Sequence, residues 1–572
     1  MHFYHLLPAL VLLVASGLYT SDRPFWRRRH SHKMSTPTLP AWPPSLPDEA
    51  RDYLSTQATD YALAHGIVYR PLPVAPSSAP ANDSAIHAPF SLFPSPFPRT
   101  LFEKAQAIQP AYDQLYAHIS SDHAFLQRVI GESVVHVDEF QKQLWDIYAS
   151  VKDDLVQPLS LGLFRSDYLL HDIENSSAAD MGSRANQLEL KQVEFNTISA
   201  SFGALCTKVN GLHRHLSSTT DYLHVHPSLA DLNNLPENQA QDVLTGGLAA
   251  AHNAYLAQGS KSQQPNNKNV YVLFVVQEGE RNAFDQRPLE HALQRQGIRV
   301  VRQSFAEIAQ RMSSAGSKRT LTLRHPVLGE IEISVVYFRA GYGPSDYTGQ
   351  TEWETRKALE LSRAIKCPSI AVQLAGAKKV QQVLAEPDQL EPLLSALSPQ
   401  LPASTATQMR ETFTDLYPLD DSALGQEGYQ LALRSPENFV LKPQREGGGN
   451  NVYRADIPPF LAALESSSSS TTDAAAAVAK RQAYILMSLI KPPAGIGNYL
   501  VKAATPGAVL AKDTVSELGV YGAILFDTSS SRAGVEVKHH QSGGYLLRTK
   551  GRESDEGGVA VGFSVIDSPL LI

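Results

Sequence analysis

Residues 439–453 carry the side chains best suited to phosphate chemistry. They read Phe-Val-Leu-Lys-Pro-Gln-Arg-Glu-Gly-Gly-Gly-Asn-Asn-Val-Tyr, so an apolar run ends at Lys442, and a carboxylate, Glu446, precedes three glycines. A cation suits phosphate oxygens, a carboxylate suits a metal ion, and glycine lets backbone amides approach an anion closely because it has no Cβ. No Gly-Lys-Ser/Thr closes the run, so it is not a Walker A loop. The alternative interpretation is a glycine-rich hairpin with charged flanks.

A second set of oxygen ligands lies in residues 193–203, Val-Glu-Phe-Asn-Thr-Ile-Ser-Ala-Ser-Phe-Gly. If this segment begins as a strand, Glu194 and Asn196 point to one face, and Val193 and Phe195 point to the other. A carboxylate and an amide oxygen side by side suit Mg²⁺, a hard cation that takes oxygen ligands. An ordinary half-exposed strand is the alternative.

The C-terminal region adds a candidate anion site. Arg548 and Lys550 are two residues apart, so on a strand they share one face. The acidic and glycine-bearing residues 553–560 follow, and such a loop can close over a ligand and exclude water. A solvated surface hairpin is the alternative.

Other polar segments follow apolar runs, where ligands of α/β proteins usually bind. They are Glu280-Arg281-Asn282 with Gln286, Arg339-Ala340-Gly341-Tyr342, and Arg165-Ser166-Asp167-Tyr168, the last interpreted as a charged turn after residues 161–164. Ser199 and Ser201 offer hydroxyls to a ligand carboxylate, or cap the helix that follows them. A plain polar turn is the alternative for each of the three segments.

Alternating strands and helices indicate an α/β region with a partly parallel sheet over 268–376. Its predicted elements are strands at Asn269–Gln277, Ile298–Val301 and Ile331–Phe338 and a helix at Trp353–Ile365. Residues 401–433 are predicted to be mostly helical. Strands of a second sheet are predicted at Phe439–Lys442, Tyr484–Ile490, Val520–Phe526 and Gly544–Thr549.

Composition indicates a large globular protein rather than a nucleic-acid binder. The chain has 572 residues, 43% of them hydrophobic, and a net charge of −7, whereas nucleic-acid binders usually present a basic face. Only two cysteines occur, Cys206 and Cys367, which excludes a disulfide framework. Both lie in apolar surroundings, so we expect buried free thiols in a reducing compartment.

The N-terminus does not match that compartment. Leu6 to Tyr19 is a mostly apolar run, too short for a spanning helix but long enough for a signal-peptide core. No Lys or Arg precedes it, and Arg27–Arg29 follow, which opposes secretion by the positive-inside tendency. Met34 offers an alternative start. We interpret residues 1–34 as an extension outside the fold, expect 1–33 to be dispensable, and predict a cytoplasmic protein, with membrane or secretory targeting as the lesser alternative.

These motifs closely resemble those of the eukaryotic glutathione synthetase family. The matching segments are VEFNTISASFG (193–203), QEGERNAFDQR (277–287), VVYFRAGY (335–342), KCPSIAVQLAGAKKVQQ (366–382), FVLKPQREGGGNN (439–451), YILM (484–487), SELG (516–519), LLRTK (546–550) and GGVA (557–560). They keep the family's order across most of the chain.

The resemblance implies an α/β, ATP-grasp fold with an inserted α/β substrate-binding lobe and a glycine-rich lid. The regions expected are 35–267, helical and part of the core, 268–376, the substrate lobe, and 377–572, the nucleotide and lid region. It implies a homodimer that uses Mg²⁺ and ATP to join γ-glutamylcysteine to glycine through an acyl phosphate, giving glutathione, ADP and phosphate.

The resemblance also assigns roles to residues. Glu194, Asn196 and Glu446 hold Mg²⁺, and Arg548 stabilises the transition state. The ATP contacts are Glu194, Lys378, Lys442, Gly447, Gly448, Gly449, Asn450, Asn451, Tyr453, Met487, Ser488, Leu489, Ile490, Glu517, Lys550 and Glu556. The dipeptide, glycine and product contacts are Arg165, Ser199, Ala200, Ser201, Glu280, Arg281, Asn282, Gln286, Arg339, Ala340, Gly341, Tyr342, Arg548, Val559 and Ala560.

Several positions depart from the family pattern. Ser488-Leu489 stands where Glu-Lys is common, Ala340 where an acid is frequent, and Glu556 where Asp is common. Two alternatives follow for the function: a family member with another amine acceptor such as β-alanine, or a non-catalytic nucleotide- and thiol-binding module. The pair Val559-Ala560 is typical of members that use glycine.

Overall fold

The computed structural model describes residues 41–71, 83–173, 188–259, 269–315, 319–397, 401–445, 449–466, 480–503, 505, 507–529, 535–555, 557–559 and 562–572. The predicted extension 1–34 lies outside the described residues, as do the predicted site residues Glu446, Gly447, Gly448, Glu556 and Ala560. Among the helices of the described part, none is both long enough and apolar enough to cross a membrane.

Within the described residues, fourteen strands form one mixed sheet. In spatial order they are β18 (Ala508–Ala511), β17 (Asn498–Val501), β3 (Phe90–Ser91), β21 (Val565–Asp567), β20 (Glu536–Gly551), β19 (Thr514–Asp527), β5 (Leu159–Asp172), β12 (Ile365–Cys367), β11 (Gly329–Phe338), β10 (Thr320–His325) and β9 (Met312–Ala315), with β6 (Leu188–Asn196) beside β5 and β7 (Val270–Val275) between β11 and β8 (Arg299–Gln303).

The large sheet forks at β5. Residues 165–172 of β5 pair with β6, Ser160 pairs with Lys366 of β12, and β19 runs along the opposite edge of β5. Because β6 and β12 occupy different halves of one edge, the chain that follows Asn196 leaves the sheet at the fork.

The predicted parallel region at 268–376 is confirmed in its pairing but is not a separate sheet. β8, β7, β11 and β12 are parallel neighbours, and β12 joins them to β5. The predicted helix Trp353–Ile365 extends too far, because Ser362 is already extended (φ −73°, ψ 161°), and α10 (Gln350–Leu361) ends there. Ile365 is instead the first residue of β12.

A second, antiparallel sheet contains β13 (Leu416–Pro418), β16 (Tyr484–Ser488), β14 (Phe439–Pro443) and β15 (Val452–Tyr453). The strands predicted at 439–442 and 484–490 belong to it. Assigning 520–526 and 544–549 to the same sheet was wrong, because these residues lie in β19 and β20, which pair with each other and, through β19, with β5. The mostly helical prediction for 401–433 missed β13.

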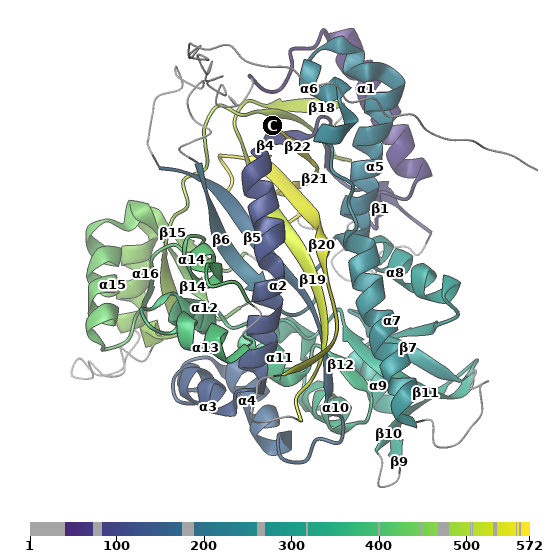
Figure 1. Cartoon of the computed structure of the whole chain (residues 1–572), viewed down its shortest axis with the longest axis vertical. Coiled ribbons are helices and arrows are strands. Elements are labelled where there is room, and N and C mark those ends of the chain that lie inside the picture. Colours follow the sequence, from purple (N-terminus) through teal and green to yellow (C-terminus); the bar gives the residue numbers. More distant parts are fainter. Residues whose placement is uncertain are drawn as a thin grey trace, which may run out of the picture. The chain divides into compact units, whose positions relative to one another are not determined.

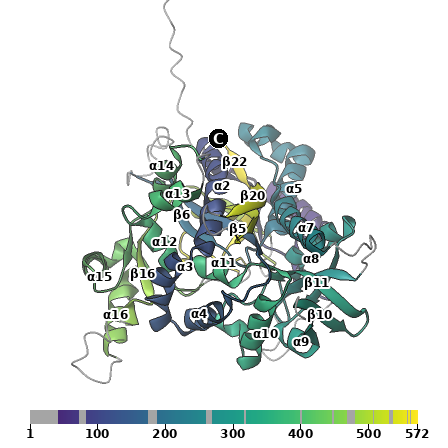
Figure 2. The same ribbon diagram turned by 60° about the horizontal axis from the view of Figure 1, so that its bottom comes forward.

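Helices cover one face of this second sheet. Figure 2 shows α15 (Ala423–Arg434) and α16 (Ile457–Ser466) beside β16. Their apolar side chains pack with Phe439, Leu441 and Leu486. Since alternate strand residues face opposite ways, Val440 and Lys442 are presented on the other face, toward a cavity.

The large sheet is covered on both faces. Figure 1 shows α2 (Arg99–Ser121) lying across β5 and β19, and α7 (Ala240–Gly259) beside the same strands. A Cβ on Gly522 of β19 would meet Asp113 of α2, whereas the Cβ of the next residue, Ala523, lies against Gly247 of α7. Consecutive strand residues face opposite ways, so the two helices lie on opposite faces.

Side chains that accept hydrogen bonds from first-turn amides begin several helices. Asp138 precedes α4 (Glu139–Val151) and Ser422 precedes α15. Four further helices are α5 (Gly203–Thr220), α8 (Ala283–Arg295), α11 (Ile370–Ala375) and α12 (Lys378–Ala385). Cys206 on α5 and Cys367 on β12 are buried free thiols, as predicted.

Candidate active site

A cavity of about 690 Å³ lies between the two sheets. Val440 and Lys442 of β14 and Met487 of β16 form one wall. The middle of β5, the end of β6 and residues of β19 and β20 contribute charged side chains to the opposite wall. The apolar side chains of Val440 and Met487 and a cluster of charged side chains therefore line the same cavity.

The end of β6 presents Glu194 and Asn196 to the cavity, which confirms their predicted common face. A bulge interrupts the β5–β6 register, with Tyr168 opposite Gln192 and Asp167 opposite Glu194. Val193 is the extra residue, and it also lines the cavity, so the bulge interrupts the simple strand alternation that was predicted for this segment.

Two lysines set the charge of Glu194. Lys378, at the start of α12, donates to Oε2 of Glu194 at 2.9 Å, and Lys442 donates to the carbonyl of Val193 at 2.8 Å. Burial favours the neutral acid, but the nearby charges of Lys378 and Lys442 outweigh it and hold the pKa of Glu194 well below its usual range. Glu194 is therefore a carboxylate at neutral pH.

Asn196 is oriented by hydrogen bonds from its amide nitrogen, which donates to Oδ2 of Asp167 at 3.0 Å and to the carbonyl of Arg165 at 3.2 Å. The amide oxygen is the atom left for a ligand. With the Glu194 carboxylate it supplies two oxygen donors of the kind that Mg²⁺ takes. Within the described part, no group of three or more His, Cys, Asp or Glu is arranged to hold a metal, and the third expected ligand, Glu446, lies outside that part.

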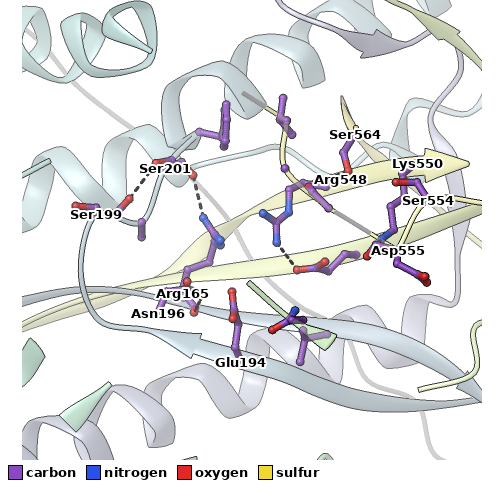
Figure 3. A pocket seen from close by; sticks show the side chains of 18 of the residues that line it. Arg165, Glu194, Asn196, Ser199, Ser201, Arg548, Lys550, Ser554, Asp555 and Ser564 are labelled. Atoms are coloured by element: carbon purple, nitrogen blue, oxygen red, sulfur yellow. Dashed lines mark hydrogen bonds and ion pairs between the residues drawn. The ribbon is translucent and has the colours of Figure 1, made fainter. Parts of the chain in front are cut away.

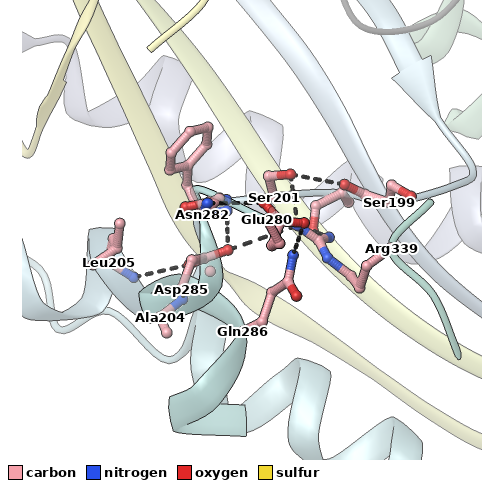
Figure 4. Close-up of polar contacts among 12 residues, drawn as sticks. Ser199, Ser201, Ala204, Leu205, Glu280, Asn282, Asp285, Gln286 and Arg339 are labelled. Carbon is pink, nitrogen blue, oxygen red and sulfur yellow. Dashed lines mark hydrogen bonds and ion pairs between the residues drawn. The ribbon is translucent and has the colours of Figure 1, made fainter. Parts of the chain in front are cut away.

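Asp285 of α8 holds the start of α5 at the fork. Its carboxylate accepts hydrogen bonds from the backbone amides of Phe202 (2.7 Å), Ala204 (3.0 Å) and Leu205 (3.1 Å), as Figure 4 shows for the last two. The carboxylate of Asp285, from another helix, therefore caps α5. Capping by Ser199 or Ser201, the alternative considered from the sequence, is not what the structure has.

Arg339, just after β11, faces Ser201 (Figure 4). Its Nη2 donates to Oγ of Ser201 at 2.8 Å and its Nη1 to the carbonyl of Ala200 at 3.0 Å. Burial disfavours its charge, but Tyr337 and Asp285 favour it, and the net result raises the pKa of Arg339. A fixed guanidinium therefore faces the cavity from the carboxyl end of β11, as predicted.

The loop before α8 is organised by Glu280. Its Oε1 accepts from the backbone amide of Asn282 at 2.8 Å and its Oε2 from Nε2 of Gln286 at 2.7 Å. All three line the cavity. Tyr342 reaches it from the Arg339 turn, where its hydroxyl accepts from Gln277 at 3.1 Å.

Arg165 and Arg548 lie on neighbouring parts of the sheet (Figure 3). The interpretation of residues 165–168 as a turn was wrong, because they lie in the middle of β5. Arg165 donates from Nη1 to the carbonyl of Ser201 at 3.1 Å, and Arg548 of β20 pairs with Glu517 of β19. Burial raises the pKa of Glu517, and the Arg548 charge opposes that rise.

Two segments meet beside the cavity wall that contains β14 and β16. Arg454 follows β15 and pairs with Asp555, which belongs to the predicted lid loop. Lys550 donates to the carbonyl of Asp555 at 2.7 Å. Farther along that loop, the carbonyl of Val559 accepts from the hydroxyl of Tyr69 at 3.0 Å. The segment with Arg454 and the loop with Asp555 therefore contact each other, and the loop also contacts Tyr69.

The cavity brings most of the predicted residues together. Those that line it are Arg165, Glu194, Asn196, Ser199, Ala200, Ser201, Glu280, Arg281, Asn282, Gln286, Arg339, Tyr342, Lys442, Asn451, Tyr453, Met487, Ser488, Leu489, Ile490, Glu517, Arg548, Lys550 and Val559. Five described residues of the prediction are not part of the lining: Lys378, which contacts Glu194, the buried Ala340 and Gly341, and the exposed Gly449 and Asn450.

Sequence reasoning missed the buried acids behind the lining. Asp167 binds Arg165, Asn196 and Arg548, and Asp285 caps α5. The signal for Asp167 was present, because it stands two residues after Arg165 and would share its face on a strand. For Asp285 no local pattern indicates a cap on a helix some 80 residues away.

The chain matches the family model "Eukaryotic glutathione synthase, ATP binding domain" over residues 48–571. The glutathione synthetase of Mus musculus is 39% identical over 534 residues, covering 93% of this chain and 99% of the relative. The glutathione synthetase large chain of Schizosaccharomyces pombe is 37% identical over 542 residues, covering 91% and 97%.

A solved structure has a similar fold. The apo form of a glutathione synthetase-like effector from Globodera pallida matches with a TM-score of 0.67 and 21% identity, over 92% of this chain and 98% of that one. The family-model match spans most of the chain, and the curated relatives are matched almost end to end. The chain therefore belongs to the eukaryotic glutathione synthase family, with its ATP-grasp type of fold.

Proposed function

We propose that this chain ligates γ-glutamylcysteine to glycine at the expense of ATP, forming glutathione, ADP and phosphate. The observation that carries the proposal is the composition of one cavity. Its nucleotide-type wall, with Lys442 and Met487, faces fixed arginines, Arg165, Arg339 and Arg548, that suit a substrate with carboxylates.

The nucleotide would lie against the second sheet. Val440, Met487 and Leu489 offer an apolar slot for a planar base, and Lys442 presents a cation at the inner end of β14. The departures at Ser488 and Leu489 leave this slot in place, because both residues line it and backbone groups there remain able to bind adenine.

The dipeptide would lie at the fork of the large sheet. Arg339 faces one end of this region, and Glu280 with Gln286 offers partners to an ammonium or amide group. Guanidinium groups bind carboxylates through paired hydrogen bonds, which fixes orientation as well as affinity.

The reaction proposed has two transfers. A carboxylate oxygen of the dipeptide attacks the γ-phosphorus, and the bond from that phosphorus to the bridging oxygen breaks, so ADP leaves. The glycine nitrogen then attacks the acyl carbon, the bond from carbon to the phosphoryl oxygen breaks, phosphate leaves, and the nitrogen releases a proton. The chain supplies positioning and charge rather than a covalent nucleophile.

Arg548 is proposed as the catalytic residue. It lines the cavity between the two walls and is held by Glu517 and Asp167. A fixed cation there would stabilise the charge that develops on the transferred phosphoryl group.

Glu194 and Asn196, with Glu446, are proposed to hold Mg²⁺, which supplies charge neutralisation of phosphate oxygens when bound. The support is the ionised Glu194 and the oriented Asn196 amide described above. Lys378 would keep Glu194 in place.

Further proposals rest on the family resemblance. They are a homodimer, a cytoplasmic location, and glycine rather than β-alanine as the acceptor, the last because Val559-Ala560 is the pair typical of glycine users. Sedimentation, localisation of the native protein, and comparison of the two amines test them separately.

The deciding experiment incubates the purified full chain with γ-glutamylcysteine, glycine, ATP and Mg²⁺, and follows ADP release and the mass of the product. Equimolar ADP and glutathione are expected. ATP binding without turnover would contradict the proposal and favour a binding module. Turnover with β-alanine alone would contradict the choice of glycine.

A further inference from the structure

Asp167 of β5 is a buried acid in contact with three functional side chains. Its side chain is 1% exposed. Arg165 donates to it twice, from Nε to Oδ1 at 2.6 Å and from Nη2 to Oδ2 at 2.7 Å. Arg548 donates to Oδ2 at 3.2 Å, and Asn196 donates to the same oxygen at 3.0 Å.

These contacts join parts of the chain that are far apart in sequence. Arg165 is two residues away on the same strand, Asn196 ends the neighbouring strand β6, and Arg548 lies on β20. All three line the cavity, whereas Asp167 does not. The carboxylate is therefore behind the wall and acts on a ligand only through the side chains that it holds.

Gly519 of β19 makes room for this arrangement. It pairs with Asp167 in the β5–β19 register. A Cβ at this position would lie 2.7 Å from Cδ of Arg165 and 2.8 Å from Oδ1 of Asp167, both below ordinary contact distance. Glycine at position 519 therefore leaves the space that the Arg165–Asp167 pair occupies, and any larger residue there would push the pair aside.

Asp167 also balances charge. The side chain of Arg165 is 6% exposed and that of Arg548 is 16% exposed, and the two like charges lie near each other. Burial lowers the pKa of both guanidinium groups, and the negative charge of Asp167 opposes that effect in each. Without Asp167, Arg548 would keep Glu517, whereas Arg165 would lose the carboxylate that it contacts.

We propose that Asp167 is the positioning residue of the site, fixing the guanidinium groups of Arg165 and Arg548 and the amide of Asn196 together through one carboxylate. The inference rests on the proposed function, since it assigns Arg165 and Arg548 to the dipeptide and the transferred phosphoryl group. It adds that these groups are positioned jointly rather than one by one.

The test compares Asp167→Asn with Asp113→Asn. The first variant keeps the size of the side chain and removes its charge. The second removes another fully buried acid, on α2 at the opposite face of β19, where it contacts His540 at 3.0 Å and does not line the cavity. Both are expected to lose thermal stability, so stability alone does not separate them.

Kinetics and binding separate them. For Asp167→Asn we expect KM for γ-glutamylcysteine to rise at least tenfold and kcat to fall at least tenfold. Isothermal titration with γ-glutamylcysteine alone is expected to give a Kd at least tenfold higher. Asp113→Asn is expected to stay within twofold of the parent chain in all three. Kinetics and binding of Asp167→Asn that match those of Asp113→Asn would overturn the proposal.

Gly519→Ala provides the same test without a change of charge. Its methyl group is expected to displace the Arg165–Asp167 pair and to raise the dipeptide Kd at least tenfold, and an unchanged Kd would count against joint positioning. This variant decides the matter if Asp167→Asn does not fold. Titration with the dipeptide needs no turnover, so a parent chain that binds the dipeptide but makes no glutathione contradicts the proposed function and leaves the role of Asp167 decided by the variants.

Discussion

Arg454, directly after β15, and Asp555, in the loop after β20, form an ion pair beside the cavity wall that contains β14 and β16: Nη1 of the arginine lies 2.6 Å from Oδ1 and 2.8 Å from Oδ2 of the aspartate. The arginine follows the glycine-rich segment after β14, and the aspartate lies in the loop between β20 and β21. Both side chains line the cavity. The ion pair therefore couples the position of the segment that carries Arg454 to that of the loop that carries Asp555.

Removing this ion pair should alter nucleotide binding more than stability. Both partners are more than 40% exposed, so the pair contributes about 0.5 kcal/mol or less to folding. We expect Arg454→Ala to change the melting temperature little and to raise KM for ATP two- to fivefold at low salt. The difference should shrink in 0.5 M NaCl because salt screens exposed charges. Lys142→Ala, which breaks an exposed pair with Asp146, is the control and should leave KM unchanged.

Lys442→Met should weaken ATP binding about tenfold, which corresponds to about 1.4 kcal/mol for one charge-assisted contact. Methionine keeps the apolar stem, so packing in β14 is retained. Equilibrium binding of ATP measures the effect. Lys379→Met is the control, because Lys379 pairs with Asp420 and does not line the cavity. Equal affinities for the two variants would contradict a phosphate role for Lys442.

Glu194→Gln should reduce kcat at least a hundredfold and shift the Mg²⁺ concentration needed for half-maximal activity upward. The amide keeps the shape of the side chain and loses the charge that a hard cation prefers. Activity titrated with MgCl₂ measures both effects. An unchanged Mg²⁺ requirement, even with lower kcat, would argue that Glu194 acts on Lys378 alone.

The low pKa of Glu194 makes a prediction for stability against pH. A carboxyl group whose pKa is lower in the folded chain stabilises it fully above the unfolded value, near 4.5, and loses that contribution as pH falls toward the folded value. We expect about 1 kcal/mol of the contribution to be lost at pH 4 relative to pH 7. The difference in melting temperature between the parent chain and Glu194→Gln, measured from pH 7 to pH 4, should shrink accordingly. A difference that stays constant would show that the pKa is not lowered.

Residues whose role follows from local pattern were predictable. The strand period placed Glu194 and Asn196 on one face, and the ends of buried strands located Glu280 and Arg339. In each case the neighbouring residues in sequence contain the information.

Residues whose role depends on a partner far away in the sequence could not be predicted. Arg165 looked like the end of a strand because a charge followed an apolar run. It continues as β5 because Asp167 neutralises it and Gly519, some 350 residues away, leaves space for it. The pairing of β19 with β5 was not predicted for the same reason. The two strands are about 350 residues apart in the sequence, and no local pattern indicates that they pair.

The pairing of β5 with β19 also has a consequence for the timing of synthesis. The edge of β5 from Leu159 to Leu169 hydrogen-bonds to residues 517–527, so a growing chain on the ribosome carries an unsatisfied strand through the synthesis of about 350 residues. Domains usually fold as they emerge, and exposed strand edges promote aggregation. We therefore expect nascent chains that stop before β19 to need chaperones, and premature termination near the C-terminus to disrupt the part of the sheet around β5 as well as the last strands.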